Sequence, residues 1–168
     1  MLLFRSTRKT VQVTANIAFT FAVALSILFT HNSMANSIGT IIEHKGNGQI
    51  VREAGEILNL SDIPSIELND TAETVNGRML IEFLDKAELS LTEHTKVYID
   101  KVYYDPDPSK SKMTMRMAIG TARFASGRLG MVNKSNISIQ TPTASIAVRG
   151  TDFTTTIDEL GRSLVILL

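Results

Sequence analysis

The stretch KMTMRMAIG at residues 112–120 constrains the fold more than any other part of the chain. Its apolar side chains recur at every second residue, so Met113, Met115, Met117 and Ile119 share one face. This period is typical of a strand with one buried face, because a helix would scatter these side chains around its circumference. Thioethers also suit copper(I), but methionines at this spacing are far more often core residues. The stretch therefore predicts a β-strand.

The same alternation recurs along residues 36–168, in GRMLIEFLD, AELSL, KVYIDKVYYD, NISIQ and SLVILL. Many short strands spaced by about 8–12 residues predict an all-β domain, whether a sandwich, a barrel or a solenoid. Helix has little room: a helical turn fits only around residues 60–66, LSDIPSI, and even there Pro64 favours a loop. Turn signals separate the strands at Gly46-Asn47-Gly48, Asn76-Gly77, Asp85-Lys86, Gly120, Ser126-Gly127, Gly130, Thr141-Pro142, Gly150 and Gly161.

The first 35 residues have the pattern of a secretory signal peptide. Three bases and no acid precede the apolar stretch 15–30, and Ser33 and Ala35 form a small-x-small cleavage site. We expect an N-terminal signal helix and cleavage after Ala35, which leaves residues 36–168 as the β domain. The alternative is an uncleaved membrane anchor, since about 20 apolar residues can span a bilayer.

The sequence stops on SLVILL, with no turn, charge or polar cap after the last apolar residue. A strand of this kind would form an unprotected sheet edge, which natural proteins normally blunt with charge, proline or cover. We therefore expect the reading frame to continue beyond Leu168.

Charge and cysteine content exclude several classes of function. The chain has 17 basic and 17 acidic residues, and the part after the signal segment is mildly acidic. Nucleic-acid binding depends on clustered lysine and arginine, so we exclude it. The chain has no cysteine, which excludes disulfides, thiolate metal sites and a cysteine nucleophile.

Residues 120–153, GTARFASGRLG…NISIQTPTASIAVRGTDF, contain the pattern GxxxFxxG followed by TPxAxxxVRGTxF. These motifs resemble the signature of the FecR domain, and the segments 39–56, 68–97 and 161–168 look like the remaining parts of that family. The resemblance implies an all-β domain whose short strands stack in a solenoid-like or β-helical manner, with a β-sandwich as the alternative.

In the best-known FecR proteins, this domain is the periplasmic half of a membrane regulator. It receives a signal from an outer-membrane siderophore transporter and controls a sigma factor. Only 14 residues precede the apolar stretch 15–30 here, too few to fold as a domain. We therefore expect an exported FecR-like domain without the cytoplasmic anti-sigma segment, in the periplasm or at the surface of a Gram-negative bacterium.

The TPTASIAVRGTDF segment predicts a corner between two strands. Gly150 permits a positive φ or a close backbone approach, and polar side chains beside it can hydrogen-bond backbone groups that a corner leaves unpaired. Arg149 bridges an adjacent coil, with Asp152 as a candidate partner, or faces a binding partner. The structural motif comprises Thr141, Pro142, Arg149, Gly150, Thr151, Asp152 and Phe153.

No residues stand out as a catalytic or metal-binding set. His44 lies beside a glycine-rich turn and His94 in a polar turn, and we expect both to be exposed. Two isolated histidines with no spacing relation to acids do not make a zinc site, which needs about three or four convergent ligands. Asp105 and Asp107 offer too few oxygens for calcium, and their prolines indicate a rigid loop. We expect no cofactor and no metal.

Two surface features have alternative interpretations. Gly127 and Gly130 indicate a corner with positive φ, flanked by solvated Arg123 and Arg128 rather than an anion site. Tyr103 and Tyr104, with Tyr98, form either a contact surface or ordinary strand packing.

The leading hypothesis is a non-enzymatic extracytoplasmic module that binds a protein or an envelope polymer, touching the membrane only through an uncleaved signal segment. The first alternative is a periplasmic sensory domain of a cell-surface signalling system that controls a sigma factor. A hydrolase that uses exposed carboxylates is the remote alternative, because no acid–base set is visible.

Overall fold

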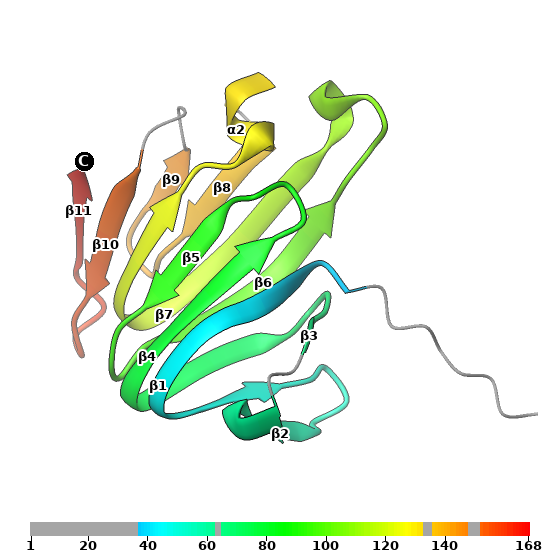
Figure 1. The fold of residues 1–168 in the computed structure, drawn as a ribbon. Coiled ribbons are helices and arrows are strands. Elements are labelled where there is room, and N and C mark those ends of the chain that lie inside the picture. Colours follow the sequence, from blue (N-terminus) through cyan, green and yellow to red (C-terminus); the bar gives the residue numbers. More distant parts are fainter. Residues whose placement is uncertain (1–36, 63–64, 133–135, 148–151) are drawn as a thin grey trace, which may run out of the picture. The chain divides into compact units, whose positions relative to one another are not determined.

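The structure of the chain, a computed structural model, describes residues 37–62, 65–132, 136–147 and 152–168 (Figure 1). These residues belong to one compact unit, Asn36–Leu168. The predicted signal segment lies outside the described residues. Within the described ranges, no helix is long and apolar enough to cross a membrane.

The described residues form one sheet of eleven strands and three short helical turns, which confirms the all-β prediction. The turn η1 (Leu60–Asp62) lies where the sequence left a helical turn and a loop open, whereas η2 (Pro108–Lys110) and α2 (Arg128–Val132) were not predicted. The strands are β1 (Gly39–Val51), β2 (Ile57–Asn59), β3 (Ser65–Ile66), β4 (Thr71–Phe83), β5 (Glu88–Leu91), β6 (Lys96–Tyr103), β7 (Lys112–Ala125), β8 (Ile137–Gln140), β9 (Ser145–Ala147), β10 (Phe153–Ile157) and β11 (Ser163–Leu167).

Alternation along the strands sets which side chains are buried. Met113, Met115 and Met117 of β7 are at most 2% exposed, which confirms the face predicted from their spacing. The same holds for Met79, Ile81 and Phe83 of β4, for Ala87, Leu89 and Leu91 around β5, and for Val97 and Ile99 of β6. The apolar face of one continuous sheet therefore supplies the core.

Three strands are much longer than the sequence predicts, because glycine-containing turn signals turn out to be bends. β1 runs through Gly46-Asn47-Gly48, β4 through Asn76-Gly77, and β7 through Gly120. Each long strand changes partners along its length. In β7, residues 112–119 pair with β6, and residues 122–125 pair with β5. The predicted chain reversals at these three places are therefore wrong.

Gly120 shows why glycine is needed at such a bend. Its φ is +97°, a conformation that side-chain-bearing residues rarely adopt. A Cβ atom there would lie 2.4 Å from Oγ1 of Thr95 and 2.5 Å from the carbonyl oxygen of His94. The Thr95 hydroxyl is also bound to the backbone of the next residue of β7, because Thr121 N donates to it at 3.0 Å. The bend of β7 is thus closed tightly against the turn that precedes β6.

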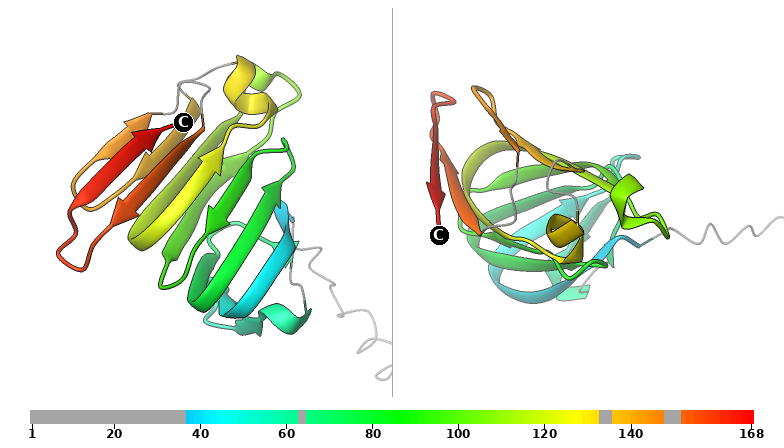
Figure 2. Two further views of the ribbon diagram at one scale, coloured as in Figure 1. Left: turned by 60° about the vertical axis from the view of Figure 1, so that its left-hand side comes forward. Right: turned by 90° about the horizontal axis from the view of Figure 1, so that it is seen from above.

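The bends divide the sheet into two regions. The β6 half contains β6, β8, β9 and residues 112–119, and the β5 half contains β5, β10, β11 and residues 120–125. Both halves line one interior cavity of about 10 Å³, through Val97, Met115, Met117 and Ile139 from the first and Leu89, Ala122, Phe124, Phe153 and Thr155 from the second. The view from above shows the strongly curved sheet that this requires (Figure 2).

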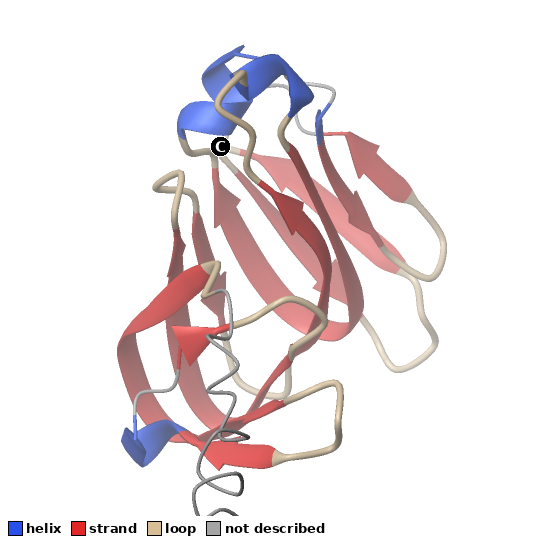
Figure 3. Cartoon of the chain, turned by 90° about the vertical axis from the view of Figure 1, so that its right-hand side faces the viewer, coloured by secondary structure: helices blue, strands red, loops and turns tan. Residues whose placement is uncertain are grey.

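The short helix α2 is held by the turn between β4 and β5, and η2 lies beside it at one end of the sheet (Figure 3). Asp85 O accepts a hydrogen bond from Arg128 N at 2.8 Å, and Asp85 Oδ2 accepts one from Leu129 N at 3.3 Å. Arg128 donates to Leu84 O at 3.1 Å, so it is not simply solvated.

The prediction that Gly127 and Gly130 form a corner with positive φ is wrong. Neither glycine is among the described residues with positive φ, and Gly130 lies inside α2. Gly127 is required by close packing instead, because a Cβ atom there would lie 2.3 Å from Ala87 N and 2.5 Å from Asp85 O.

Candidate functional site

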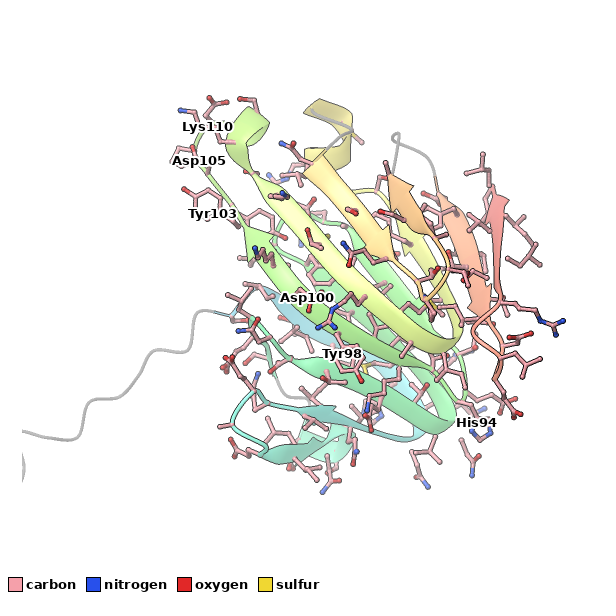
Figure 4. All side chains as sticks on the ribbon, turned by 180° about the vertical axis from the view of Figure 1, so that it is seen from behind. His94, Tyr98, Asp100, Tyr103, Asp105 and Lys110 are labelled. Atoms are coloured by element: carbon pink, nitrogen blue, oxygen red, sulfur yellow. The ribbon has the colours of Figure 1, made fainter. Side chains whose placement is uncertain are left out.

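The outer face of the β6 half carries a row of polar side chains around Tyr98. Lys96, Tyr98 and Asp100 alternate along β6 with the buried Val97 and Ile99, so all three point outward. Tyr98 and Asp100 appear on this face in Figure 4. The outward positions exist because the other face of the strand is committed to the core.

Strand pairing brings residues from distant parts of the sequence beside Tyr98. Lys96 of β6 is paired with Glu73 of β4, and Tyr98 is paired with Arg116 of β7. Arg116 is in turn paired with Gln140 of β8. Cross-strand neighbours on one face lie about 4.5–5.5 Å apart at Cβ, close enough for their side chains to interact.

Both cations of the row are held by acidic partners. Lys96 Nζ lies 2.6 Å from Glu73 Oε1, and Arg116 donates to both carboxylate oxygens of Asp100, at 2.7 and 2.6 Å. Such a two-pronged pair fixes the orientation of the guanidinium plane as well as its position. The hydrogen bond to Asp100 raises the pKa of Arg116, and the hydrogen bond to Glu73 raises the pKa of Lys96.

Glu73 is shifted in the opposite direction. Burial alone would raise its pKa, but hydrogen bonds from Lys96 and Gln49 outweigh burial and hold the pKa of Glu73 below its usual range. Gln49 Nε2 donates to Glu73 Oε2 at 2.8 Å. The carboxylate is therefore kept ionised in the folded protein, which keeps Lys96 in place beside Tyr98.

The Tyr98 ring interacts with both cations. Lys96 Nζ lies 5.4 Å from the ring centroid and Arg116 Cζ lies 5.1 Å from it, both within the range of cation–π attraction. The aromatic side chain is consequently held in place on the surface of a rigid sheet. A preordered aromatic contact loses little conformational entropy when it binds a partner.

An open groove of about 210 Å³ lies along this row. We call it the Tyr98 groove; it is lined by Tyr98, Arg116, Met117, Ala118, Gln140, Thr141 and Pro142. The groove contains an aromatic ring, an ion-paired guanidinium and an amide. Its chemistry suits a polar ligand with some apolar surface, such as an extended peptide or a sugar chain.

Thr141 and Pro142, two residues of the predicted motif, form the turn between β8 and β9 as well as one wall of the groove. Thr141 N donates to Ala144 O at 2.8 Å, and Ala144 N donates to Thr141 Oγ1 at 3.0 Å. The turn also contacts the start of β11, where the Thr141 and Ser163 hydroxyls lie 2.8 Å apart.

The remaining motif residues lie elsewhere. Phe153 is buried in β10 and packs against Phe124 with ring centroids 5.8 Å apart. Asp152 Oδ2 accepts a hydrogen bond from Arg123 at 2.7 Å, so Arg123 is ion-paired rather than solvated. Arg149, Gly150 and Thr151, the centre of the predicted corner, lie outside the described residues.

The two adjacent tyrosines proposed as contact residues point in different directions. Tyr103 is 56% exposed, and its hydroxyl donates to Asp105 Oδ2 at 2.7 Å at the loop end of β6 (Figure 4). Tyr104 instead packs against the core and donates to Asp85 Oδ1 at 3.2 Å. Of the pair, Tyr103 offers the exposed ring.

The histidines are placed only partly as expected. His94 is exposed, as predicted, but His44 is half-buried, and its Nδ1 is buried without a hydrogen-bond partner among the described residues. The described residues hold no group of three or more His, Asp or Glu side chains arranged to bind a metal. Asp105 and Asp107 cap their own loop, since they accept hydrogen bonds from Asp107 N and Ser109 N.

Sequence reasoning identified Tyr98, Thr141 and Pro142 separately but missed Lys96, Arg116 and Gln140. The available signal was their alternation with buried residues, which marks them as outward-facing. The signal that was missing is the register, because only the fold sets positions 98, 116 and 140 side by side.

Comparison with known proteins gives one match. A family model described as "FecR protein" matches residues 70–168, which is more than half of the chain and runs from the start of β4 to the end of the sequence. The match confirms the resemblance found in the motifs, although β1 to β3 precede the matched range. No curated protein and no solved structure matches the chain.

Proposed function

Because the chain belongs to the FecR family, we propose that residues 36–168 form a non-enzymatic binding module of the bacterial cell envelope. Its partner is a protein or an envelope polymer, and its location is the periplasm or the cell surface. The signal-peptide pattern at residues 1–35 supports export. The family resemblance also supports a solenoid-like stacking of the strands.

The observation that carries this proposal is the geometry of the Tyr98 groove. Tyr98 is held by Lys96 and Arg116, and both cations are fixed by carboxylates on neighbouring positions. Arg116 is exposed and Tyr98 is half-buried. Arginine and tyrosine are enriched among the residues that dominate the affinity of protein interfaces. The groove is open and shallow, as a contact surface for a macromolecule requires.

Matched arginine substitutions test the proposal. Arg116 and Arg123 both lie on β7, both are ion-paired, and both side chains are 55% exposed, but only Arg116 lines the Tyr98 groove. The tagged full-length chain is used to capture envelope proteins and to sediment with isolated cell-wall sacculi. We expect Arg116→Ala and Tyr98→Ala to lower retention of the partner at least fivefold, and Arg123→Ala to leave it unchanged.

Equal retention by all variants would remove the Tyr98 groove as the binding surface. Retention of no envelope component by the wild-type chain, above that of an unrelated exported β-protein, would contradict the binding function itself.

Membership of the FecR family favours a second candidate, a sensory domain of a cell-surface signalling system that controls a sigma factor. Gene neighbourhood distinguishes the two functions. A sigma factor and a TonB-dependent transporter encoded beside this gene favour signalling, whereas secretion or surface-layer genes favour structural binding.

Deletion of the gene also distinguishes a signalling domain from a binding module. A signalling domain predicts altered transcription from the promoters of the neighbouring sigma factor. A binding module predicts unchanged transcription and a changed envelope composition.

A further inference from the structure

Two Asn-Gly dipeptides lie at the bend that β1 and β4 share. Asn47-Gly48 belongs to β1 and Asn76-Gly77 to β4, and the two strands run side by side (Figure 1). The register of this strand pair skips residues 47, 75 and 76. Both asparagines therefore lie where the regular pairing of β1 with β4 is interrupted.

The asparagine side chains at this bend are free. Both are exposed, and neither amide forms a hydrogen bond with a described residue. Two other asparagines differ in this respect. Asn69 Nδ2 donates to Glu53 Oε2 at 2.9 Å, and Asn136 Nδ2 donates to Ser109 O at 2.7 Å.

The amide N–H of Gly48 points away from β4. Thr74 N donates to Thr95 O at 2.9 Å, so the main-chain groups of residue 74 point away from β1. Thr74 is the partner of Gly48, and the two residues of such a non-hydrogen-bonded pair both point outward. On the other side of β1, β2 ends at Asn59, opposite Gln49. The Gly48 N–H consequently has no acceptor among the described residues.

The amide N–H of Gly77 points away from β1. Phe83 N donates to Ala87 O at 2.9 Å, on the β5 side of β4. Because the direction alternates along a strand, residues 81, 79 and 77 point to that same side. β5 ends at Leu91, opposite Met79, and so does not extend to Gly77. Among the described residues, no main-chain acceptor binds the N–H that follows either asparagine of the bend.

We propose that this bend is a site of spontaneous covalent modification, at which Asn47 and Asn76 convert to aspartate and isoaspartate. The glycine nitrogen attacks Cγ of the preceding asparagine and forms a C–N bond. Its proton passes to the amide nitrogen Nδ2, which leaves as ammonia when the Cγ–Nδ2 bond breaks. Water then opens the cyclic imide at either of its two carbonyl carbons. Glycine favours the first step because it has no Cβ atom to hinder the approach.

Modification at position 47 reaches the Tyr98 groove through the backbone. Isoaspartate lengthens the main chain by one methylene group, which shifts the residues that follow Asn47 against their partners. Gln49 is two residues further on, and its Nε2 donates to Glu73 Oε2 at 2.8 Å. Glu73 in turn holds Lys96 beside Tyr98. The bend therefore acts as a slow chemical switch on the order of this row.

Peptide mapping by mass spectrometry tests the reaction. The full-length chain is kept in mildly alkaline buffer, folded in one sample and unfolded by guanidinium chloride in another. We expect Asn47 and Asn76 to deamidate in the folded chain at rates within about fivefold of those in the unfolded chain. In the same folded sample, both should react at least about tenfold faster than Asn69 and Asn136, whose amides are held.

A matched pair of variants tests the effect on the sheet. In Asn76→Gln, only position 47 of the bend can form the imide readily. Melting temperature should fall in proportion to the isoaspartate content of the aged Asn76→Gln chain, measured with an isoaspartyl methyltransferase. Asn47→Asp should melt like the wild type, because it adds the charge without lengthening the main chain.

Deamidation of both asparagines more than about fivefold slower in the folded than in the unfolded chain would overturn the proposal, because the bend would then protect them. An unchanged melting temperature in chains rich in isoaspartate would overturn the switch. Neither measurement involves a binding partner, so this proposal can fail while the proposed function stands.

Discussion

The hydroxyl of Tyr104 donates a hydrogen bond to Oδ1 of Asp85, and this contact joins the end of β6 to the turn between β4 and β5. Burial, together with the nearby Asp85 carboxylate, raises the pKa of Tyr104. The same carboxylate accepts hydrogen bonds from Ala87 N and Leu129 N. Asp85 thereby links β5, β6 and α2 through one buried side chain.

Replacing Tyr104 with phenylalanine removes one of these bonds and keeps the ring. We expect the free energy of unfolding to fall by about 1 kcal/mol, the usual net value of a buried hydrogen bond. Urea unfolding followed by circular dichroism measures the change. Tyr103→Phe serves as the control and should change the stability by less than about 0.5 kcal/mol, because its hydroxyl binds an exposed carboxylate. Equal losses in the two variants would contradict the role of Asp85.

Acid should weaken the fold partly through Glu73. The pKa of Glu73 is lower in the folded protein than its ordinary value of 4.5, so the folded state binds fewer protons near that pH than the unfolded state. The stabilisation is complete above the ordinary pKa and is lost as the pH falls through the lowered value.

Unfolding measured across this pH range tests the sign. Glu73→Gln should be less stable than the wild type at neutral pH and should lose less stability as the pH falls. The exposed Glu88→Gln is the control and should keep the acid dependence of the wild type. A Glu73→Gln variant with the full acid dependence would show that other carboxylates are responsible.

Thr155 places a hydroxyl in an apolar interior. Its Oγ1 is buried without a hydrogen-bond partner among the described residues, and its side chain lines the small interior cavity. Because an unpaired buried hydroxyl is costly, Thr155→Val should leave stability unchanged or raise it by about 1 kcal/mol. Thr156→Val is the contrasting variant, since the Thr156 hydroxyl lies 3.0 Å from that of Thr121. Thermal melts that show a clear loss for Thr155→Val would contradict this account.

Gly127 should tolerate no side chain. Gly127→Ala places a Cβ atom 2.3 Å from Ala87 N, and the contact is with backbone rather than with a flexible side chain. We expect a loss of about 3 kcal/mol or more, or failure to fold.

Gly55→Ala separates this effect from backbone strain. Gly55 has φ of +86°, but a Cβ atom added there would meet no described atom within 4 Å, so the loss should stay near about 1–2 kcal/mol. Losses of similar size at Gly127 and Gly55 would show that close packing at Gly127 is unimportant.

Side-chain alternation predicted the core well because the buried face of a strand is a local property. Met113, Met115 and Met117 need only a period of two to be assigned to the interior. The bend at Gly120 could not be predicted in the same way. A glycine with positive φ occurs both where a chain reverses and where a long strand bends, and only pairing with β5 and β6 separates the two cases.

The candidate site was predictable residue by residue but not as a site. Tyr98 and the Thr141-Pro142 turn are recognisable in the sequence, yet about 40 residues separate them. Their proximity depends on the parallel pairing of β8 with β7, which places Gln140 beside Arg116. No local pattern in the chain specifies that pairing.

The bends in β1, β4 and β7 also determine how the domain comes apart. Each of these strands contributes backbone to more than one region of the sheet, so the β6 half cannot detach while the β5 half keeps its pairing. Amide protons in β6 and β10 should then become exchangeable with solvent at the same denaturant concentration. We therefore expect the continuity of three strands to make unfolding a single all-or-none event.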